Sequence, residues 1–94
     1  MKAIWNGKVI AESDKTYKIE GNIYFPPETV NKEYIQKSDH TTYCYWKGDA
    51  SYFDVVVGGK VNKDAAWYYQ NPPEIVERMK DYVAFWNGIE ITDK

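Results

Sequence analysis

Several residue types are scarce in this 94-residue chain, and each scarcity excludes a class of site. The chain has one cysteine, Cys44, and one histidine, His40. A lone cysteine cannot form a disulfide within the chain, and one cysteine with one histidine cannot complete a four-ligand zinc site in a single chain. We therefore expect no bound metal and no cofactor.

Positive charge is also scarce, because Arg78 is the only arginine and the basic and acidic residues are interspersed to a net charge of −2. Such a surface has no field that would gather phosphates, so we expect no nucleic-acid partner. The chain lacks a run of ~20 apolar residues and begins without the apolar stretch of a signal peptide. We expect a soluble, cytoplasmic protein without a membrane partner.

Aromatic residues are plentiful, with four tryptophans, nine tyrosines and three phenylalanines in 94 residues. This length predicts a single domain over residues 1–94, and folding hides only about two thirds of the surface of so short a chain. Tyrosines that lie half buried on sheet faces explain most of these aromatic side chains. The remainder should line a pocket, a groove or a partner surface.

Turn residues divide the chain into short strands. Asn6-Gly7 predicts a type I′ turn in a hairpin over residues 3–12, and Gly21-Asn22 predicts a second hairpin. Gly58-Gly59 should end a β-branched and aromatic strand over residues 52–57, and Asn87-Gly88 should close a last hairpin.

The segments between these strands are less regular. Residues 36–41 are polar and are expected to form a loop, and Asn62-Lys63-Asp64 is expected to form a turn. Residues 65–70, which include Trp67, are expected to form a strand or an extended segment over the core.

Two helices are predicted. After Pro26-Pro27, residues 28–35 favour a short helix. A longer C-terminal helix is expected to begin at Asn71, with Ile75, Met79 and Val83 recurring every four residues on its buried side. Residues 82–86 equally fit a last strand. The predicted fold class is α+β, a compact and mainly antiparallel β structure rich in hairpins, with one C-terminal helix and one short helix.

Five segments in this order resemble the DUF427 family of small domains of unknown function, also labelled nucleotidyltransferase domain 9, over nearly the whole chain. The residues that carry the resemblance are Trp5-Asn6-Gly7, Tyr24-Phe25-Pro26-Pro27, Thr42-x-Cys44-x-x-Lys47-Gly48-x-Ala50-x-Tyr52, Ala66-Trp67-x-Tyr69-x-x-Pro72 and Val83-Ala84-Phe85-Trp86.

The resemblance implies a β-rich fold similar to the Mss4-like or β-tent domains, whose zinc ligands are absent from this chain. This chain departs from the family in having Tyr45 where members usually have a proline. The label implies nucleotidyl transfer, which needs paired carboxylates for Mg²⁺ and a phosphate cradle. The sequence offers only Glu12-Ser13-Asp14 and Gly58-Gly59, neither in the context of a strand-to-helix phosphate loop.

The stretch from Thr42 to Tyr52 is the most promising place for a site, because it combines Cys44, Lys47 and Gly48 with several aromatics. Cys44 is a candidate nucleophile if His40 or Lys47 activates it, although a buried cysteine with a purely structural role has the same appearance. Lys47 could hold an anion, with Gly48 allowing close approach; a sheet edge and a bulge explain them equally.

Three functions are therefore compared. The first is a binding domain whose aromatic-lined pocket takes a small anionic or planar ligand, with ligand-binding residues Trp46, Lys47, Gly48, Tyr52 and Trp67. The second is an enzyme that uses Cys44 with His40 or Lys47. The third is a structural or interaction module, in which the surplus aromatics form a homodimer or partner face.

Overall fold

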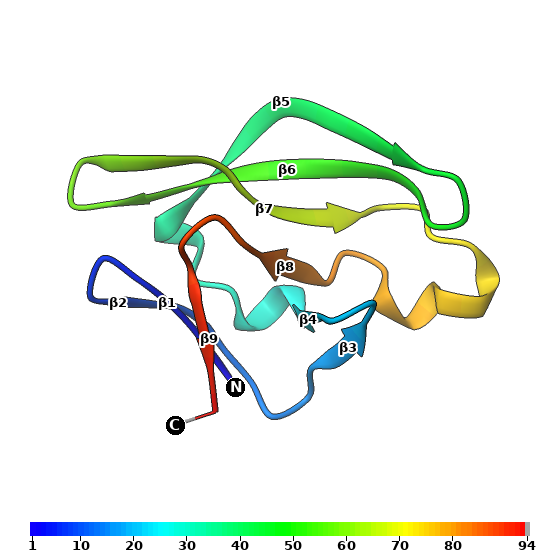
Figure 1. The fold of residues 1–94 in the computed structure, drawn as a ribbon, viewed down its shortest axis with the longest axis horizontal. Helices are drawn as coiled ribbons and strands as arrows, with labels where there is room; N and C mark the ends of the chain where they lie inside the picture. Colours follow the sequence, from blue (N-terminus) through cyan, green and yellow to red (C-terminus); the bar gives the residue numbers. More distant parts are fainter. Residues whose placement is uncertain (94) are drawn as a thin grey trace.

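The computed structural model describes residues 1–93 and contains two antiparallel sheets (Figure 1). A three-stranded sheet has the order β2-β1-β9, and a six-stranded sheet has the order β3-β4-β8-β7-β6-β5. In chain order the elements are β1 (Lys2–Trp5), β2 (Lys8–Glu12), β3 (Tyr17–Ile19), β4 (Asn22–Phe25), the 3-10 segments η1 (Pro27–Thr29) and η2 (Lys32–Tyr34), β5 (Ile35–Cys44), β6 (Gly48–Val57), β7 (Lys60–Tyr69), the 3-10 segment η3 (Glu74–Met79), β8 (Val83–Phe85) and β9 (Glu90–Thr92).

The predicted turns occur largely where expected. Asn6 and Gly7 have φ angles of 50° and 78°, and they join β1 to β2 as the sequence predicts. Gly58-Gly59 joins β6 to β7 in the same way. At the second hairpin the left-handed residues are Glu20 and Gly21, one position earlier than predicted, so Asn22 belongs to β4.

The last Asn-Gly pair does not close a hairpin. Asn87 and Gly88 have the expected positive φ angles, but β8 before them lies in the six-stranded sheet and β9 after them pairs with β1. The turn therefore carries the chain from one sheet to the other, where Ile89 joins the larger core and Ile91 packs against it.

Two segments predicted as a loop and a turn belong to long strands. Residues 36–41 lie within β5, and residues 62–64 lie within β7. The register of β5 against β6 shifts between Lys37 and Thr41, and Asp64 has a φ of 55° where β7 bulges. β5 is an edge strand and is mostly exposed, which explains a polar composition that resembles a loop.

The predicted C-terminal α-helix is instead the short 3-10 segment η3, and Pro73 precedes it without a side-chain cap. Met79 is buried, but Ile75 is 82% exposed, so the two do not share a buried face. Val83 lies in β8, where pairing with β4 and β7 on both sides requires an extended backbone and ends the helix earlier.

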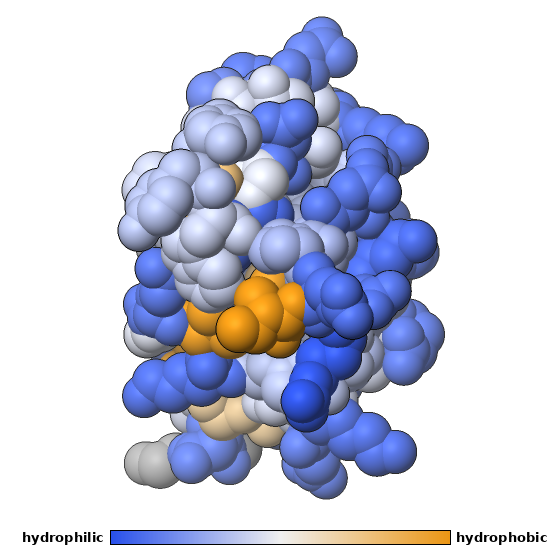
Figure 2. Space-filling model, turned by 90° about the vertical axis from the view of Figure 1, so that its right-hand side faces the viewer, coloured by the Kyte–Doolittle hydropathy of each residue, from blue (hydrophilic) through white to orange (hydrophobic). Residues whose placement is uncertain are grey.

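The side of the molecule on which η3 lies is mostly hydrophilic, with one compact apolar patch (Figure 2). Ile19, Ile75 and Val76 line a shallow depression at η3. The predicted helix over residues 28–35 is likewise two 3-10 turns, η1 and η2, and Val30 between them forms a β-bridge with Ala11.

The six-stranded sheet buries side chains on both faces. Because residues alternate along a strand, Phe25 and Tyr24 on β4 point to opposite sides. Phe25 belongs to the larger core, which includes Ala3, Ile10 and Ile89 of the three-stranded sheet side. Tyr24 belongs to a second, smaller cluster, which Met79 of η3 covers. This second face is only partly covered, and the candidate site lies there.

Candidate functional site

Strand register gathers aromatic side chains on the second face of the six-stranded sheet. Tyr24 on β4 pairs with Ala84 on β8, Ala84 pairs with Trp67 on β7, and Trp67 pairs with Tyr52 on β6. Directly paired residues point to the same side of a sheet. The small Ala84 between Tyr24 and Trp67 leaves room for both rings, so three aromatics form a row across the sheet.

This row forms the wall of an open cavity of about 280 Å³. Such a volume lies at the lower end of the range of about 300 to 1,000 Å³ that is typical of small-molecule sites. It suits a ligand of one or two rings. The lining side chains are Asn22, Tyr24, Lys47, Tyr52, Trp67, Tyr69 and Trp86.

Contacts between the rings hold the wall in place. The Trp67 indole N–H donates a hydrogen bond to the Tyr24 hydroxyl oxygen over 3.1 Å, and the two rings meet edge to face at 6.2 Å. Tyr52 lies on the other side of Trp67, with ring centroids 6.5 Å apart. Tyr24 is fully buried, so it anchors the more exposed Trp67.

Lys47 supplies the positive charge of the cavity. It lies in the turn between β5 and β6, yet it is only 5% exposed. Its ammonium stands 5.3 Å from the ring centroids of both Trp46 and Tyr69, a cation–π geometry. Its ionic partner is the carboxylate of Glu20, in the turn between β3 and β4.

The ionisation of these groups follows from their contacts. Burial alone would lower the pKa of Lys47, but the hydrogen bond to Glu20 and nearby negative charge outweigh it and raise that pKa above 10.5. The bond from Lys47 lowers the pKa of Glu20. Burial raises the pKa of Tyr69, although Lys47 beside it acts in the opposite direction. The pair is therefore an ammonium and a carboxylate near neutral pH.

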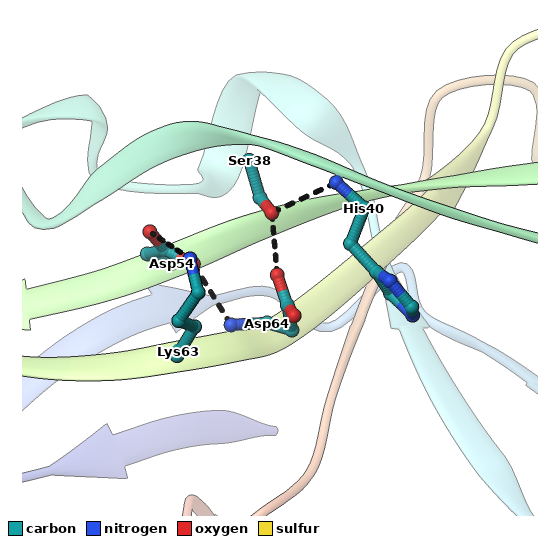
Figure 3. A network of polar contacts seen from close by, with 5 residues as sticks. All are labelled: Ser38, His40, Asp54, Lys63 and Asp64. Carbon is teal, nitrogen blue, oxygen red and sulfur yellow. Dashed lines mark hydrogen bonds and ion pairs between the residues drawn. The ribbon is translucent and has the colours of Figure 1, made fainter.

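Trp86 is held at the cavity by a polar network centred on Asp64, whose contacts with Ser38 and Asp54 are drawn in Figure 3. Its indole N–H donates to the carbonyl oxygen of Asp64 over 2.7 Å. The Asp64 amide donates to the buried Asp54 carboxylate, and the Ser38 hydroxyl donates to the Asp64 carboxylate. These bonds fix the left-handed backbone of Asp64 and, through it, the position of Trp86.

The structure does not bring Cys44 and His40 into this cavity's lining. Cys44 is half buried and packs against the second core cluster, which includes Tyr69. The His40 ring lies 4.6 Å from the Tyr52 ring, and only its backbone amide bonds to Ser38. Figure 3 shows the imidazole pointing away from Ser38 and Asp64, so these three residues form no catalytic relay.

Gly48 lies at a different hollow. With Tyr43, Asp49 and Asn71 it lines a polar depression of about 430 Å³. Its φ of 93° is a left-handed conformation, and a Cβ here would come within 3.4 Å of the Asn71 carbonyl oxygen. The glycine thus serves the turn and the approach of a neighbouring segment.

The sequence identified part of the cavity. It predicted Lys47, Tyr52 and Trp67, which do line it. It also predicted Trp46, which is not a lining residue; the Lys47 ammonium lies over its ring. It did not single out Tyr24, Tyr69 and Trp86, although all three occur in the segments that carry the family resemblance, nor did it single out Asn22. Glu20 carried no signal beyond its place before Gly21, because its contact with Lys47 spans 27 positions of the chain.

The residues considered for nucleotidyl transfer lie on an exposed strand end and in a hairpin turn. Glu12 and Asp14 are exposed on and after β2, and Gly58-Gly59 forms a hairpin turn. Among residues 1–93, no three His, Cys, Asp or Glu side chains group together as ligands for a metal ion. Within the same residues, no helix has the length and apolar character needed to cross a membrane.

Comparison with known proteins agrees with the resemblance seen in the sequence. A family model described as a domain of unknown function, DUF427, matches residues 1–93. A search of curated proteins found no match. Because the family model spans all but the last of the 94 residues, the chain belongs to the DUF427 family.

Proposed function

We propose that this protein is a small binding domain that holds a planar ligand of one or two rings in the aromatic cavity. The observation that carries the proposal is the pair of partly exposed rings, Trp67 and Tyr52, on the second face of the sheet, with the fully buried Tyr24 holding Trp67 in place. Aromatic faces stack on planar ligands, and rings fixed on strands lose little freedom when a ligand binds.

The polar groups of the cavity support stacking as the main source of affinity. The Trp67 indole N–H donates a hydrogen bond to the Tyr24 hydroxyl, and the Lys47 ammonium donates one to the Glu20 carboxylate. Among residues 1–93, every buried side-chain nitrogen and oxygen has a hydrogen-bond partner. A ligand therefore gains from contact with the rings more than from unmet polar groups.

The other two functions have less support. Cys44 packs beside the second core cluster, and the His40 ring contacts the Tyr52 ring in a tilted geometry at the edge strand, so their positions do not combine into one reactive site at the cavity. A homodimer face stays a prediction, because the structure describes one chain and therefore no contact between two copies.

The proposal is tested by titrating uniformly ¹⁵N-labelled protein with indole-3-carboxamide and following the four tryptophan indole N–H signals. We expect the Trp67 and Trp86 signals to shift with one saturating curve. The Trp5 signal should stay constant, because Trp5 packs against the larger core away from the cavity.

A pair of variants supplies the control. Trp86→Ala removes a ring that lines the cavity and is 53% exposed, and it should weaken binding by about two- to tenfold, the scale of one lost stacking contact. Tyr43→Ala removes an exposed ring that is not among the cavity's lining residues, and it should leave binding unchanged. No shift with indole-3-carboxamide or with other one- and two-ring heteroaromatics at millimolar concentration would contradict the proposal.

A further inference from the structure

The aromatic cavity contains one charged side chain, and that charge already has a partner. Lys47 is the only ionised group near neutral pH among the lining residues, and the Glu20 carboxylate bonds to its ammonium. Glu20 is not itself a lining residue; it reaches Lys47 from the neighbouring turn. The position that would attract a ligand's anion is therefore occupied by a group of the protein.

Glu20 is well placed to keep that position. It lies in a two-residue turn beside Gly21 with a backbone φ of 54°, and from that turn its carboxylate contacts the Lys47 ammonium. A partner tethered in this way acts at a high effective concentration, typically millimolar or more. A free anion would have to displace Glu20 and would form a bond of the same kind as the one it breaks.

The Glu20 side of the ion pair is accessible to a ligand. The Glu20 side chain is 52% exposed, whereas the Lys47 side chain is only 6% exposed. A second carboxylate at this place would meet the negative charge of Glu20. A neutral carboxamide would instead accept a hydrogen bond from an ammonium through its carbonyl oxygen and donate an N–H to a carboxylate.

We propose that Glu20 sets the charge selectivity of the aromatic cavity, so that its ligand is a neutral planar molecule bearing an amide-like donor and acceptor, and not the corresponding acid. The inference rests on the proposed function, and it narrows the ligand from any planar molecule to a neutral planar one. Glu20 acts here as a specificity-determining residue and not as a contact of the aromatic wall.

The test compares two probes of nearly identical shape, indole-3-carboxamide and indole-3-carboxylate, at pH 7. Each is titrated into the wild-type protein and into Glu20→Gln, with the Trp67 and Trp86 indole signals as the readout. Glu12→Gln is the matched control, because it makes the same change in net charge at an exposed carboxylate that pairs with Lys2 on the other sheet.

In the wild type we expect the amide to bind more tightly than the acid. In Glu20→Gln the acid should gain about tenfold relative to the amide, the scale of one hydrogen bond to a charged group. Glu12→Gln should leave the ratio of the two affinities unchanged.

The outcomes separate this inference from the proposed function. If the acid binds the wild type more tightly than the amide, or if its relative affinity is the same in Glu20→Gln, Glu20 does not set selectivity, although the cavity still binds planar ligands. If neither probe nor any other planar compound binds, the proposed function fails, and the inference fails with it. The wild-type comparison needs no variant and stands even if Glu20→Gln folds poorly.

Discussion

Alanine substitutions at Ile75 and Met79 test how the segment before β8 is built. The two residues are four positions apart, so a regular α-helix would place both on one buried face. In the structure η3 is a 3-10 segment with non-helical angles at Val76, and only Met79 is buried. The two substitutions should therefore differ sharply in their effect on the free energy of unfolding.

The expected magnitudes follow from burial. Met79 is fully buried and packs with Tyr24, Tyr69 and Ala84, so Met79→Ala should cost about 2 to 4 kcal/mol through lost contacts and the cavity left behind. Ile75 is 82% exposed, so Ile75→Ala should change stability by no more than about 0.5 kcal/mol. For a domain of this size, each kcal/mol shifts the melting temperature by about 4–8 °C.

Urea denaturation followed by tryptophan fluorescence measures both variants, and thermal unfolding gives an independent value. The Ile75 variant is the control, because it removes an aliphatic side chain from the same segment. Similar losses for the two variants would refute the 3-10 arrangement and favour the helix predicted from the sequence. A small loss at Met79 would refute its role as the cover of the second core cluster.

Two further predictions concern the site. Tyr24→Phe removes the acceptor of the Trp67 indole and should cost about 1–2 kcal/mol, with a changed Trp67 indole N–H signal; an unchanged signal would show that this hydrogen bond is not formed in solution. Because Lys47 lowers the pKa of Glu20, their ion pair stabilises the fold fully above pH 4.5, and this stabilisation is lost as the pH falls through the lowered pKa of Glu20. Because Glu20 raises the pKa of Lys47, the stabilisation is fully present below pH 10.5 and is lost as the pH rises through the raised pKa of Lys47. Lys47→Met should flatten the acid part of a stability-against-pH curve, and an acid part identical to that of the wild type would contradict the ion pair.

Local chemistry predicted much of the β structure. Asn6-Gly7 and Gly58-Gly59 adopt the positive φ angles that two-residue hairpins require, and the structure has them as turns. The same chemistry misled at Asn87-Gly88, because a turn type determines how the chain reverses but not which strand the next segment pairs with. That choice depended on β1, more than 80 positions away, whose free side accepts β9.

Helical periodicity was misleading for a similar reason. Ile75, Met79 and Val83 have the spacing of a helix face, but the pairing of β8 with two neighbours requires Val83 to be extended. Strand pairing on both sides satisfies more backbone groups than one additional helical turn at the end of a short segment. The Mss4-like architecture implied by the family resemblance stays a prediction.

By itself the sequence determined the class of the protein: one mainly antiparallel β domain of the DUF427 family, with more aromatic side chains than its core can bury. Composition and turn residues act locally, so they can be read without coordinates. The tertiary structure alone decided the site. Register across four strands aligned Tyr24, Trp67 and Tyr52, and the meeting of two turns placed Glu20 on Lys47. Both depend on contacts between distant positions, which no local pattern encodes.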